Sequence, residues 1–292
     1  MSSTKPESPS DPGNEGPPPR ENVTAEFWRS DALPQLESRR SCREVACYRP
    51  HTHDRFSIGL IDAGESSFTG ASGRSVELRP GDVLCIPAGH VHACNPEGGR
   101  WEYQMIHAEQ YWIRQLLGAA DPEAGETARL LGAISVFRVP GLHRRFDALN
   151  ERLFAGGVPD PARIGEELRN GLRRCARAVP LHREAPVSDP ETSTRLRAVI
   201  ARLRDDEMAP ALDELAELAG MSRFQLIRAM KRTTGLTPTS WRHDHRVNAA
   251  RRLLREGGTL AGVAAELGFA DQSHFHRVFR SHVASTPGSY RA

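Results

Sequence analysis

The sequence predicts an α+β protein. An N-terminal antiparallel β-barrel with trailing helices is followed by an all-α domain with two helix-turn-helix units. Three observations support this prediction. The chain has 292 residues, which is enough for two domains with separate cores. Short strand-like segments gather in the first half of the chain. A helix-pair pattern occurs twice in the last hundred residues.

The repeated pattern consists of Ala-x-x-x-Gly, a helical run with two apolar anchors, and a Thr-Pro pair. The two copies are 48 residues apart at the alanines and glycines. Alanine lets two helices approach closely, and glycine turns the chain with positive φ. Two such units in tandem indicate a protein that reads two stretches of DNA. The residues are Ala216, Gly220, Leu226, Met230 and Thr237-Pro238 in the first copy, and Ala264, Gly268, Phe275, Phe279 and Thr286-Pro287 in the second.

The N-terminal segment and the cysteines limit the class of protein. Residues 1–25 are rich in Ser, Pro, Gly and Glu, which predicts a disordered tail. This tail has no apolar h-region, and no apolar run of 18 residues occurs in the chain, so neither a secretory signal nor a membrane span is expected. The five cysteines include no C-x-x-C pair, which argues against a disulfide framework or a thiolate zinc site. We therefore expect a cytoplasmic protein with no membrane partner.

Residues 26–178 are expected to form the barrel and its trailing helices. Clusters of Gly, Pro, Asp and Ser separate short segments rich in Val, Ile, Leu and Phe, which is typical of a small barrel or jelly roll. From about Ala108 the pattern becomes helical, and these helices are expected to pack on the barrel or on a second subunit. Packing on a second subunit would make residues 26–178 a dimerisation domain. The predicted strands are Glu44–Tyr48, Phe56–Ile61, Ser75–Leu78, Val83–Ile86 and Trp101–His107, and the later helices are Leu142–Phe154 and Pro161–Ala178.

Residues 179–193 contain three prolines, which predicts a linker to the helical domain of residues 194–292. From Ser193 onward, 16 basic and 10 acidic residues give a net charge of +6, whereas the rest of the chain carries −4. This asymmetry is expected if only the C-terminal domain meets a polyanion, and a random fluctuation is the alternative. The predicted helices after the first are Leu212–Ala219, Arg223–Thr234, Pro238–Arg255, Leu260–Leu267 and Gln272–Val283.

A recognition helix must bury an apolar face and present polar or cationic groups to the DNA groove. In the second unit, Phe275, Val278 and Phe279 form the apolar stripe. Arginine can bond guanine bidentately, and glutamine can bond adenine in the same way. The intervening helix of about 17 residues spans roughly 25 Å, which suits reading helices about one DNA turn apart. The outward-facing candidates are Arg223, Arg228, Lys231 and Arg232 in the first unit, and Gln272, Ser273, His274 and Arg277 in the second.

The stretch from Gly268 to Arg280, followed by Thr-Pro-Gly-Ser-Tyr-Arg at 286–291, resembles the signature of the AraC/XylS family of bacterial transcription regulators. The resemblance covers the last hundred residues and implies that the second helix of each unit enters the major groove. At two of the implied positions, Phe224 and Ile227, the side chains are apolar and could equally belong to the core of the domain. By position, the resemblance implies base contacts from Phe224, Ile227 and Arg228 in the first unit, and from Gln272, Ser273, His274 and Arg277 in the second.

The segment His51-Thr52-His53 places two imidazoles on one face of an extended segment. The downstream pattern Gly81-x5-Pro87-x-Gly89-x2-His92-x2-Asn95 resembles the second motif of the cupin barrel, and His-x-His resembles part of the first. Cupin-like sensors ahead of this DNA-binding domain are a common arrangement in the family. In metal-binding cupins the first motif also supplies a Glu, but Ser57 and Ile58 occupy that place here. A full two-motif metal site is therefore absent.

Three histidines, His51, His53 and His92, could still hold a divalent metal with one position left for water or a ligand. His90 could substitute for His92. The alternative is that the imidazoles hydrogen-bond within the barrel, or hold an anionic effector, without metal. Aromatic residues of the same strands could line an effector pocket or form ordinary core. The candidate effector-binding residues are His51, His53, Phe56, His92, Trp101 and Tyr103.

These features favour a sequence-specific, AraC/XylS-type transcription regulator that is controlled by a small molecule in the barrel and is not an enzyme. Its expected partners are double-stranded DNA, the effector, a second copy of the chain and, for an activator, RNA polymerase. One alternative is a metal-dependent cupin enzyme fused to a DNA-binding domain, against which the missing Glu argues. Another is a nucleoid-type protein with no effector.

Overall fold

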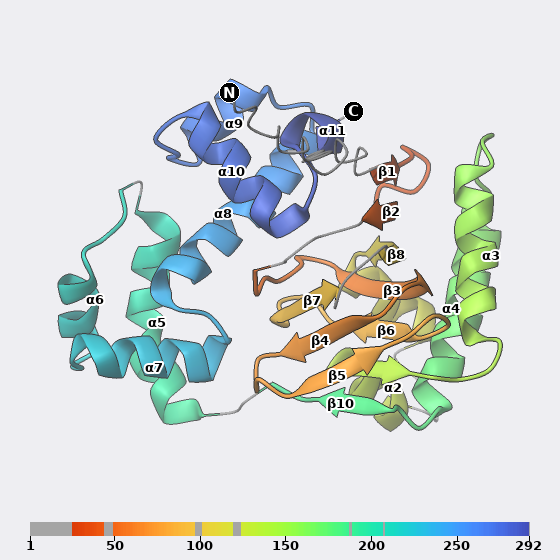
Figure 1. The fold of residues 1–292 in the computed structure, drawn as a ribbon, viewed down its shortest axis with the longest axis horizontal. Helices are drawn as coiled ribbons and strands as arrows, with labels where there is room; N and C mark the ends of the chain where they lie inside the picture. Colours follow the sequence, from red (N-terminus) through yellow and green to blue (C-terminus); the bar gives the residue numbers. More distant parts are fainter. Residues whose placement is uncertain are drawn as a thin grey trace, which may run out of the picture.

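The computed structural model describes residues 25–43, 49–96, 101–118, 124–186, 189–206 and 208–291. The predicted tail, apart from Ala25, and the predicted strand Glu44–Tyr48 lie outside these residues. Figure 1 shows β-sheets with flanking helices on one side and the C-terminal helices on the other. The predicted α+β class and the order of the two parts are confirmed.

The strands form two antiparallel sheets, ordered β1-β2-β8-β3-β6-β9-β10 and β5-β4-β7. The predicted strands Phe56–Ile61, Ser75–Leu78, Val83–Ile86 and Trp101–His107 are confirmed as β3, β5, β6 and β8, with small differences in their ends. The strands are β1 Ala25–Trp28, β2 Leu36–Arg43, β3 Phe56–Ala63, β4 Ser66–Gly70, β5 Ser75–Leu78, β6 Val83–Ile86, β7 His92–Pro96, β8 Trp101–Ala108, β9 Ile134–Phe137 and β10 His182–Glu184.

Six strands were not predicted, and β2 shows why. Its sequence Leu-Glu-Ser-Arg-Arg-Ser-Cys-Arg has no apolar alternation. The strand nevertheless pairs with β1 and β8, and its Glu37 and Arg39 are buried. These charged side chains make contacts with the C-terminal helices, which a strand pattern read by itself does not reveal.

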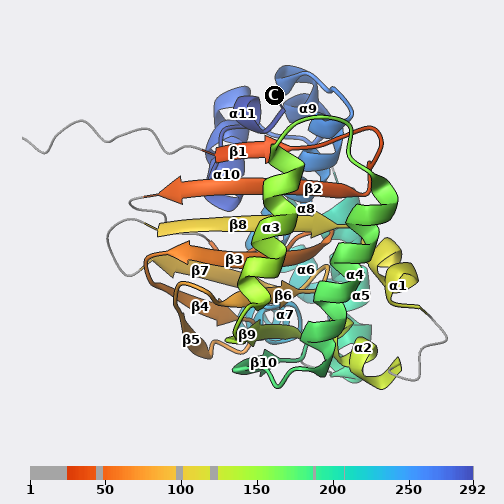
Figure 2. The same ribbon diagram turned by 90° about the vertical axis from the view of Figure 1, so that its right-hand side faces the viewer.

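Four helices accompany the sheets: α1 Gln110–Leu117, α2 Ala124–Leu131, α3 Leu142–Phe154 and α4 Pro161–Arg177. Figure 2 shows α3 and α4 lying across one face of the larger sheet. Phe146, Leu168 and Leu172 from these helices are fully buried against Phe56 and Leu60 of β3. The predicted helices 142–154 and 161–178 are confirmed, whereas α2 was not predicted.

Two parts of the predicted linker 179–193 have regular structure. Strand β10 lies at the edge of the larger sheet, where it pairs with β9. Helix α5, Pro190–Asp205, begins at the third proline, with Asp189 as its N-cap. Proline fits the first helical turn because its missing N–H has no partner there. A segment rich in proline can therefore start a helix as well as link domains.

The remaining helices form the C-terminal domain and follow the predicted pattern. Ser222 caps α7 through a capping box with Gln225, and Gly235 ends it with a φ of 79°. Thr237 caps α8, and Pro238 occupies its first turn. These helices are α6 Leu212–Leu218, α7 Arg223–Thr234, α8 Pro238–Arg255, α9 Leu260–Glu266, α10 Gln272–Val283 and α11 Pro287–Arg291.

Each helix-turn-helix unit has its own core. The first unit, α6 and α7, packs Leu226 and Met230 against Leu196 and Val199 of α5. The second unit, α9 and α10, packs its aromatic side chains with residues of α8 and α11. Gly220 and Gly268 occupy the tight turns with φ of 60° and 64°, as the sequence predicts. The connecting helix α8 has 18 residues and links the two units.

Candidate sensor pocket and nucleic-acid interface

The second helix of each unit, α7 or α10, leaves one side exposed while its apolar stripe is buried. In α7, Arg228 and Lys231 are exposed, and Leu226 is fully buried. Phe224 is 77% exposed and Ile227 is half-buried, so Phe224 does not belong to the core. Its ring is therefore available to a partner outside the chain.

Helix α10 repeats this arrangement in the second unit. Gln272, Ser273 and Arg277 are exposed and His274 is half-buried. Phe275 and Phe279 are fully buried on the opposite side. Asp271 caps the helix by accepting a hydrogen bond from the backbone N–H of His274. The polar residues of both helices therefore remain available to a partner.

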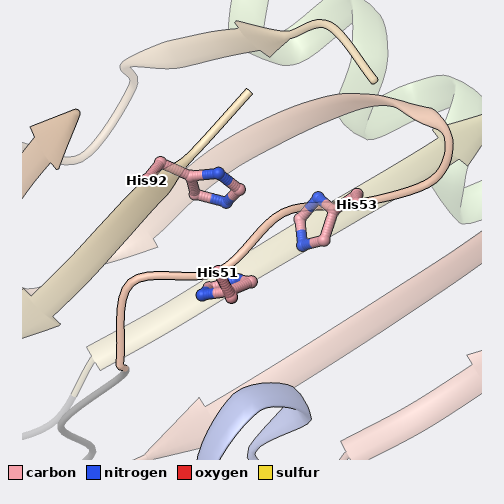
Figure 3. Close-up of side chains that lie close together, drawn as sticks. All are labelled: His51, His53 and His92. Carbon is pink, nitrogen blue, oxygen red and sulfur yellow. The ribbon is translucent and has the colours of Figure 1, made fainter. Parts of the chain in front are cut away.

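The three predicted histidines lie together between the sheets (Figure 3). One ring nitrogen from each of His51, His53 and His92 lies within 4.8 Å of the others. Two backbone hydrogen bonds between His51 and His92, each 3.0 Å, fasten the segment to the start of β7. His90 is not part of this cluster, and its Nδ1 lies 3.2 Å from the Ala88 carbonyl oxygen.

Hydrogen bonds orient the three rings. Nδ1 of His51 donates to the Arg49 carbonyl at 2.9 Å, and Nδ1 of His92 donates to the His90 carbonyl at 3.0 Å, so the lone pair resides on Nε2 of both rings. Nδ1 of His53 lies 2.8 Å from Ser57 Oγ. Ser57, which replaces the cupin Glu, thus holds a histidine in place.

Burial keeps the cluster uncharged. It lowers the pKa of His51 and of His53 well below the usual value, and it lowers the pKa of His92 to about 4. Three neutral imidazoles are suitable ligands for a first-row transition metal. The donor set and its hydrogen-bonded support therefore fit a metal ion, which is the hypothesis that the sequence left open.

The cluster borders a cavity of about 60 Å³. Trp101 and Tyr103 of β8 line it as a stacked pair with ring centroids 4.6 Å apart. Phe56 does not line the cavity, which corrects the prediction for this residue. It packs on the opposite face of β3, because successive side chains of a strand point to opposite faces.

Sequence reasoning missed several residues of this cavity. His107 of β8 lines it and lies 2.8 Å from Ser57 Oγ, and its strand alternation was the only available signal. Arg251 of α8, together with His282 and Val283 of α10, also lines it. These last residues are more than 190 positions from His53, so no local pattern could place them there.

A buried cluster around Glu37 joins the two domains beside the cavity. The Glu37 carboxylate accepts hydrogen bonds from Arg29 at 2.9 Å, Tyr290 at 2.8 Å and Arg251 at 3.3 Å. Arg255 lies 3.6 Å away. Burial alone would raise the pKa of Glu37, but Arg251 and Arg29 outweigh it, so the net shift is downward. Glu37 is therefore ionised and ties β2 to α8 and α11.

A second set of contacts comes from the histidine segment itself. The backbone N–H and the hydroxyl of Thr52 donate to the Asp244 carboxylate at 2.8 and 2.5 Å. Asn248 of α8 donates to Thr52 Oγ1 at 3.0 Å. Asp54 lies 3.5 Å from Arg255 and 3.8 Å from Arg252. The cavity wall and the C-terminal domain thus meet along residues 51–54.

Among the described residues, no helix combines the length and apolarity required to cross a membrane.

Comparison with known proteins gives matches for both domains. A family model described as AraC-like ligand binding domain matches residues 39–224, and one described as helix-turn-helix domain matches residues 215–292. The arabinose operon regulatory protein of Salmonella typhimurium is 26% identical over 257 residues, which cover 84% of this chain and 86% of that protein. The transcriptional activator NphR of Rhodococcus sp is 38% identical over 116 residues, or 39% of this chain and 32% of NphR.

Among solved structures, ToxT from Vibrio cholerae has a similar fold. It superposes with a TM-score of 0.51 at 13% identity, covering 88% of this chain and 98% of ToxT. This similarity extends over both domains and supports the arrangement of sheets followed by helices.

A β-sheet pocket joined to two helix-turn-helix units defines a ligand-responsive, DNA-binding transcription regulator. Because the ligand-binding model matches more than half of the chain, the chain belongs to the AraC family. Its N-terminal domain binds a small molecule, and its C-terminal domain binds DNA. The relatives are regulators of transcription, which does not favour the enzyme alternative.

Proposed function

We propose that this regulator reads two consecutive segments of one DNA site, one with α7 and the other with α10. The matching exposure of the two helices over separate cores is the observation that supports this proposal. Neither helix needs its polar side for its own packing. The proposed contact residues are Phe224, Ile227, Arg228 and Lys231 on α7, and Gln272, Ser273, His274 and Arg277 on α10.

The effector is proposed to occupy the cavity beside the histidine cluster. His51, His53, His92, Trp101 and Tyr103 would contact it, since all five line the cavity. ToxT has been solved with an unsaturated fatty acid bound, so a related fold accommodates a small molecule. At about 60 Å³, the cavity described here is smaller than the space that ligands of drug size occupy. The effector is therefore small, unless the domains separate to admit it.

The proposed regulator is not an enzyme and works as a homodimer in the bacterial cytoplasm, where it meets DNA and, if it activates, RNA polymerase. Helices α1 to α4 and the segment that follows them are the proposed surface for a second copy. Tyr111 of α1 is 72% exposed and Leu181 after α4 is 49% exposed. Sedimentation of the full chain tests the dimer: a monomer at micromolar concentration contradicts it.

Sequencing of genomic DNA recovered with the full chain, followed by footprinting, tests the DNA-reading proposal. We expect a discrete protected site with two half-sites about one helical turn apart. Uniform coating of the DNA would instead support the nucleoid-type alternative. A protected segment under only one unit would contradict reading by both helices.

A further inference from the structure

The side chains of residues 51–54 point alternately toward the histidine cluster and toward helix α8. His51 and His53 point into the cluster with His92 (Figure 3). Thr52, between them, bonds Asp244 of α8, and Asp54 approaches Arg255 of the same helix. Neighbouring side chains of an extended segment point in opposite directions. A movement of the backbone that repositions His51 and His53 therefore also displaces Thr52 and Asp54.

The geometry points to a metal-sensing site. We infer that His51, His53 and His92 bind one divalent first-row transition-metal ion, and that residues 51–54 transmit its presence to α8 and so to the DNA-binding units. This inference deepens the proposed function, since it names the effector class of the same cavity, and it depends on that function for its output.

The ligand set supports a metal more specifically than an organic anion. All three rings are buried and neutral, and backbone carbonyls already accept the Nδ1 protons of His51 and His92. Such outer hydrogen bonds orient histidine ligands and raise their basicity. Ser57 supports His53 in the same way and is itself within 2.8 Å of His107 Nδ1. Imidazole ligands without a carboxylate favour Zn²⁺, Fe²⁺, Ni²⁺ or Cu²⁺ over Mg²⁺ or Ca²⁺.

The position of the site explains how an ion could affect the DNA-binding domain. Arg251 of α8 lines the same cavity while one of its nitrogens bonds Glu37. A divalent cation adds positive charge beside this buried arginine, and like charges repel strongly where water is excluded. Ligation also draws the two histidines together, which moves Thr52 between them. Both effects act on α8 within about two turns, at Asp244, Asn248 and Arg251.

Titration of the metal-free full chain with ZnCl₂, followed by calorimetry, tests the site. We expect one Zn²⁺ per chain. Ser57→Ala removes only the hydroxyl that supports His53 and should weaken Zn²⁺ binding by about 10–100-fold, and His53→Ala by at least as much. His90→Ala, two residues from His92 but outside the cluster, should leave the Zn²⁺ affinity unchanged. Circular dichroism establishes that each variant is folded.

Absence of Zn²⁺ binding, or binding that survives both Ser57→Ala and His53→Ala in folded protein, overturns the site. Co²⁺ in place of Zn²⁺ provides a second readout, because its visible absorption reports nitrogen ligation directly. Absorption typical of an all-oxygen shell would likewise overturn the three-histidine assignment.

DNA binding with and without Zn²⁺ tests the transmission, with a fragment recovered from the genomic experiment as the probe. We expect the two affinities to differ by about 5–150-fold, the usual range for coupled sites. Thr52→Val should retain Zn²⁺ binding but shrink this difference, whereas Thr69→Val on β4 should not. Equal DNA affinities of metal-free and Zn²⁺-loaded wild type overturn the transmission. Failure to bind DNA in either state would instead overturn the proposed function.

Discussion

The two helix-turn-helix units share a pattern but differ in their attachment to the sensor domain. The second unit packs directly on the sensor domain. Phe27 of β1 contacts Tyr290 in the core of that unit, and Arg39 of β2 donates a hydrogen bond to the Val283 carbonyl at 2.6 Å. The first unit approaches the sensor at its Gly235 turn, next to Val91 and Ala71. The duplicated sequence therefore does not produce two equivalent units.

This difference indicates how effector binding can act on DNA. The second unit, with α8, is held by a buried ionic cluster at Glu37 and by an aromatic core that includes a sensor residue. The first unit has an aliphatic core completed by α5. A change at the cavity therefore reaches the second unit through these buried contacts, and the first unit through α8 and the contact of its Gly235 turn with Val91. We expect the spacing between the units on DNA to be the regulated quantity.

The largest expected effect is that of Glu37→Ala, which removes the attachment of the second unit. It leaves Arg251 buried without its carboxylate partner and Arg255 with Asp54 alone, and breaking a buried pair in this way typically costs about 3–5 kcal/mol. Urea unfolding measures the loss. Glu77→Ala, which breaks an exposed pair with Arg79, serves as the control and should leave the unfolding free energy unchanged. A similar stability for both variants would show that the cluster does not hold the domains together.

The contact of the first unit is tested by two glycine substitutions. Gly235→Ala and Gly257→Ala both place a side chain at positive φ, for about 1–2 kcal/mol each. Only at Gly235 would the new Cβ lie 2.9 Å from Val91, whereas nothing lies within 4 Å at Gly257. The forced shift should add about 1–3 kcal/mol. Equal losses in thermal unfolding would mean that the first unit does not rest on the sensor.

The two reading helices are compared on DNA by Arg228→Ala and Arg277→Ala. Each should lower the affinity for the cognate site by about 1–3 kcal/mol and relax specificity at one base pair. The affected base pairs should lie in different half-sites, because the arginines belong to different units. Binding measurements on single-base variants of the site locate them. An equal loss on random DNA would contradict base reading by that residue.

The smallest expected effect is that of Lys231→Ala on α7. A phosphate contact contributes about 0.9 to the slope of log affinity against log salt concentration, so this slope should decrease by that amount while base preference persists. Arg163→Ala, on α4 of the sensor domain, should leave it unchanged. If the slope of the Lys231 variant matches that of the wild type, Lys231 does not touch the DNA backbone.

Local chemistry made the helices and the three histidines predictable. Capping residues such as Ser222 and Thr237 and turn glycines such as Gly235 act within a few positions, so they are visible in the sequence. Strand β2 and the cavity wall at Arg251 were not predictable, because their character depends on residues from the other domain. Phe56 shows a third case: the strand was predicted, but not which of its faces borders the cavity.

The wall that Arg251 and Val283 provide has a kinetic consequence. For a molecule larger than this cavity, we expect entry to require that the C-terminal helices swing aside. Its association rate would then level off at high concentration, at the rate of that opening. A bare ion needs no such swing, and its association would stay proportional to concentration. The dependence of the association rate on ligand concentration therefore distinguishes a cavity that must open from one that is already accessible.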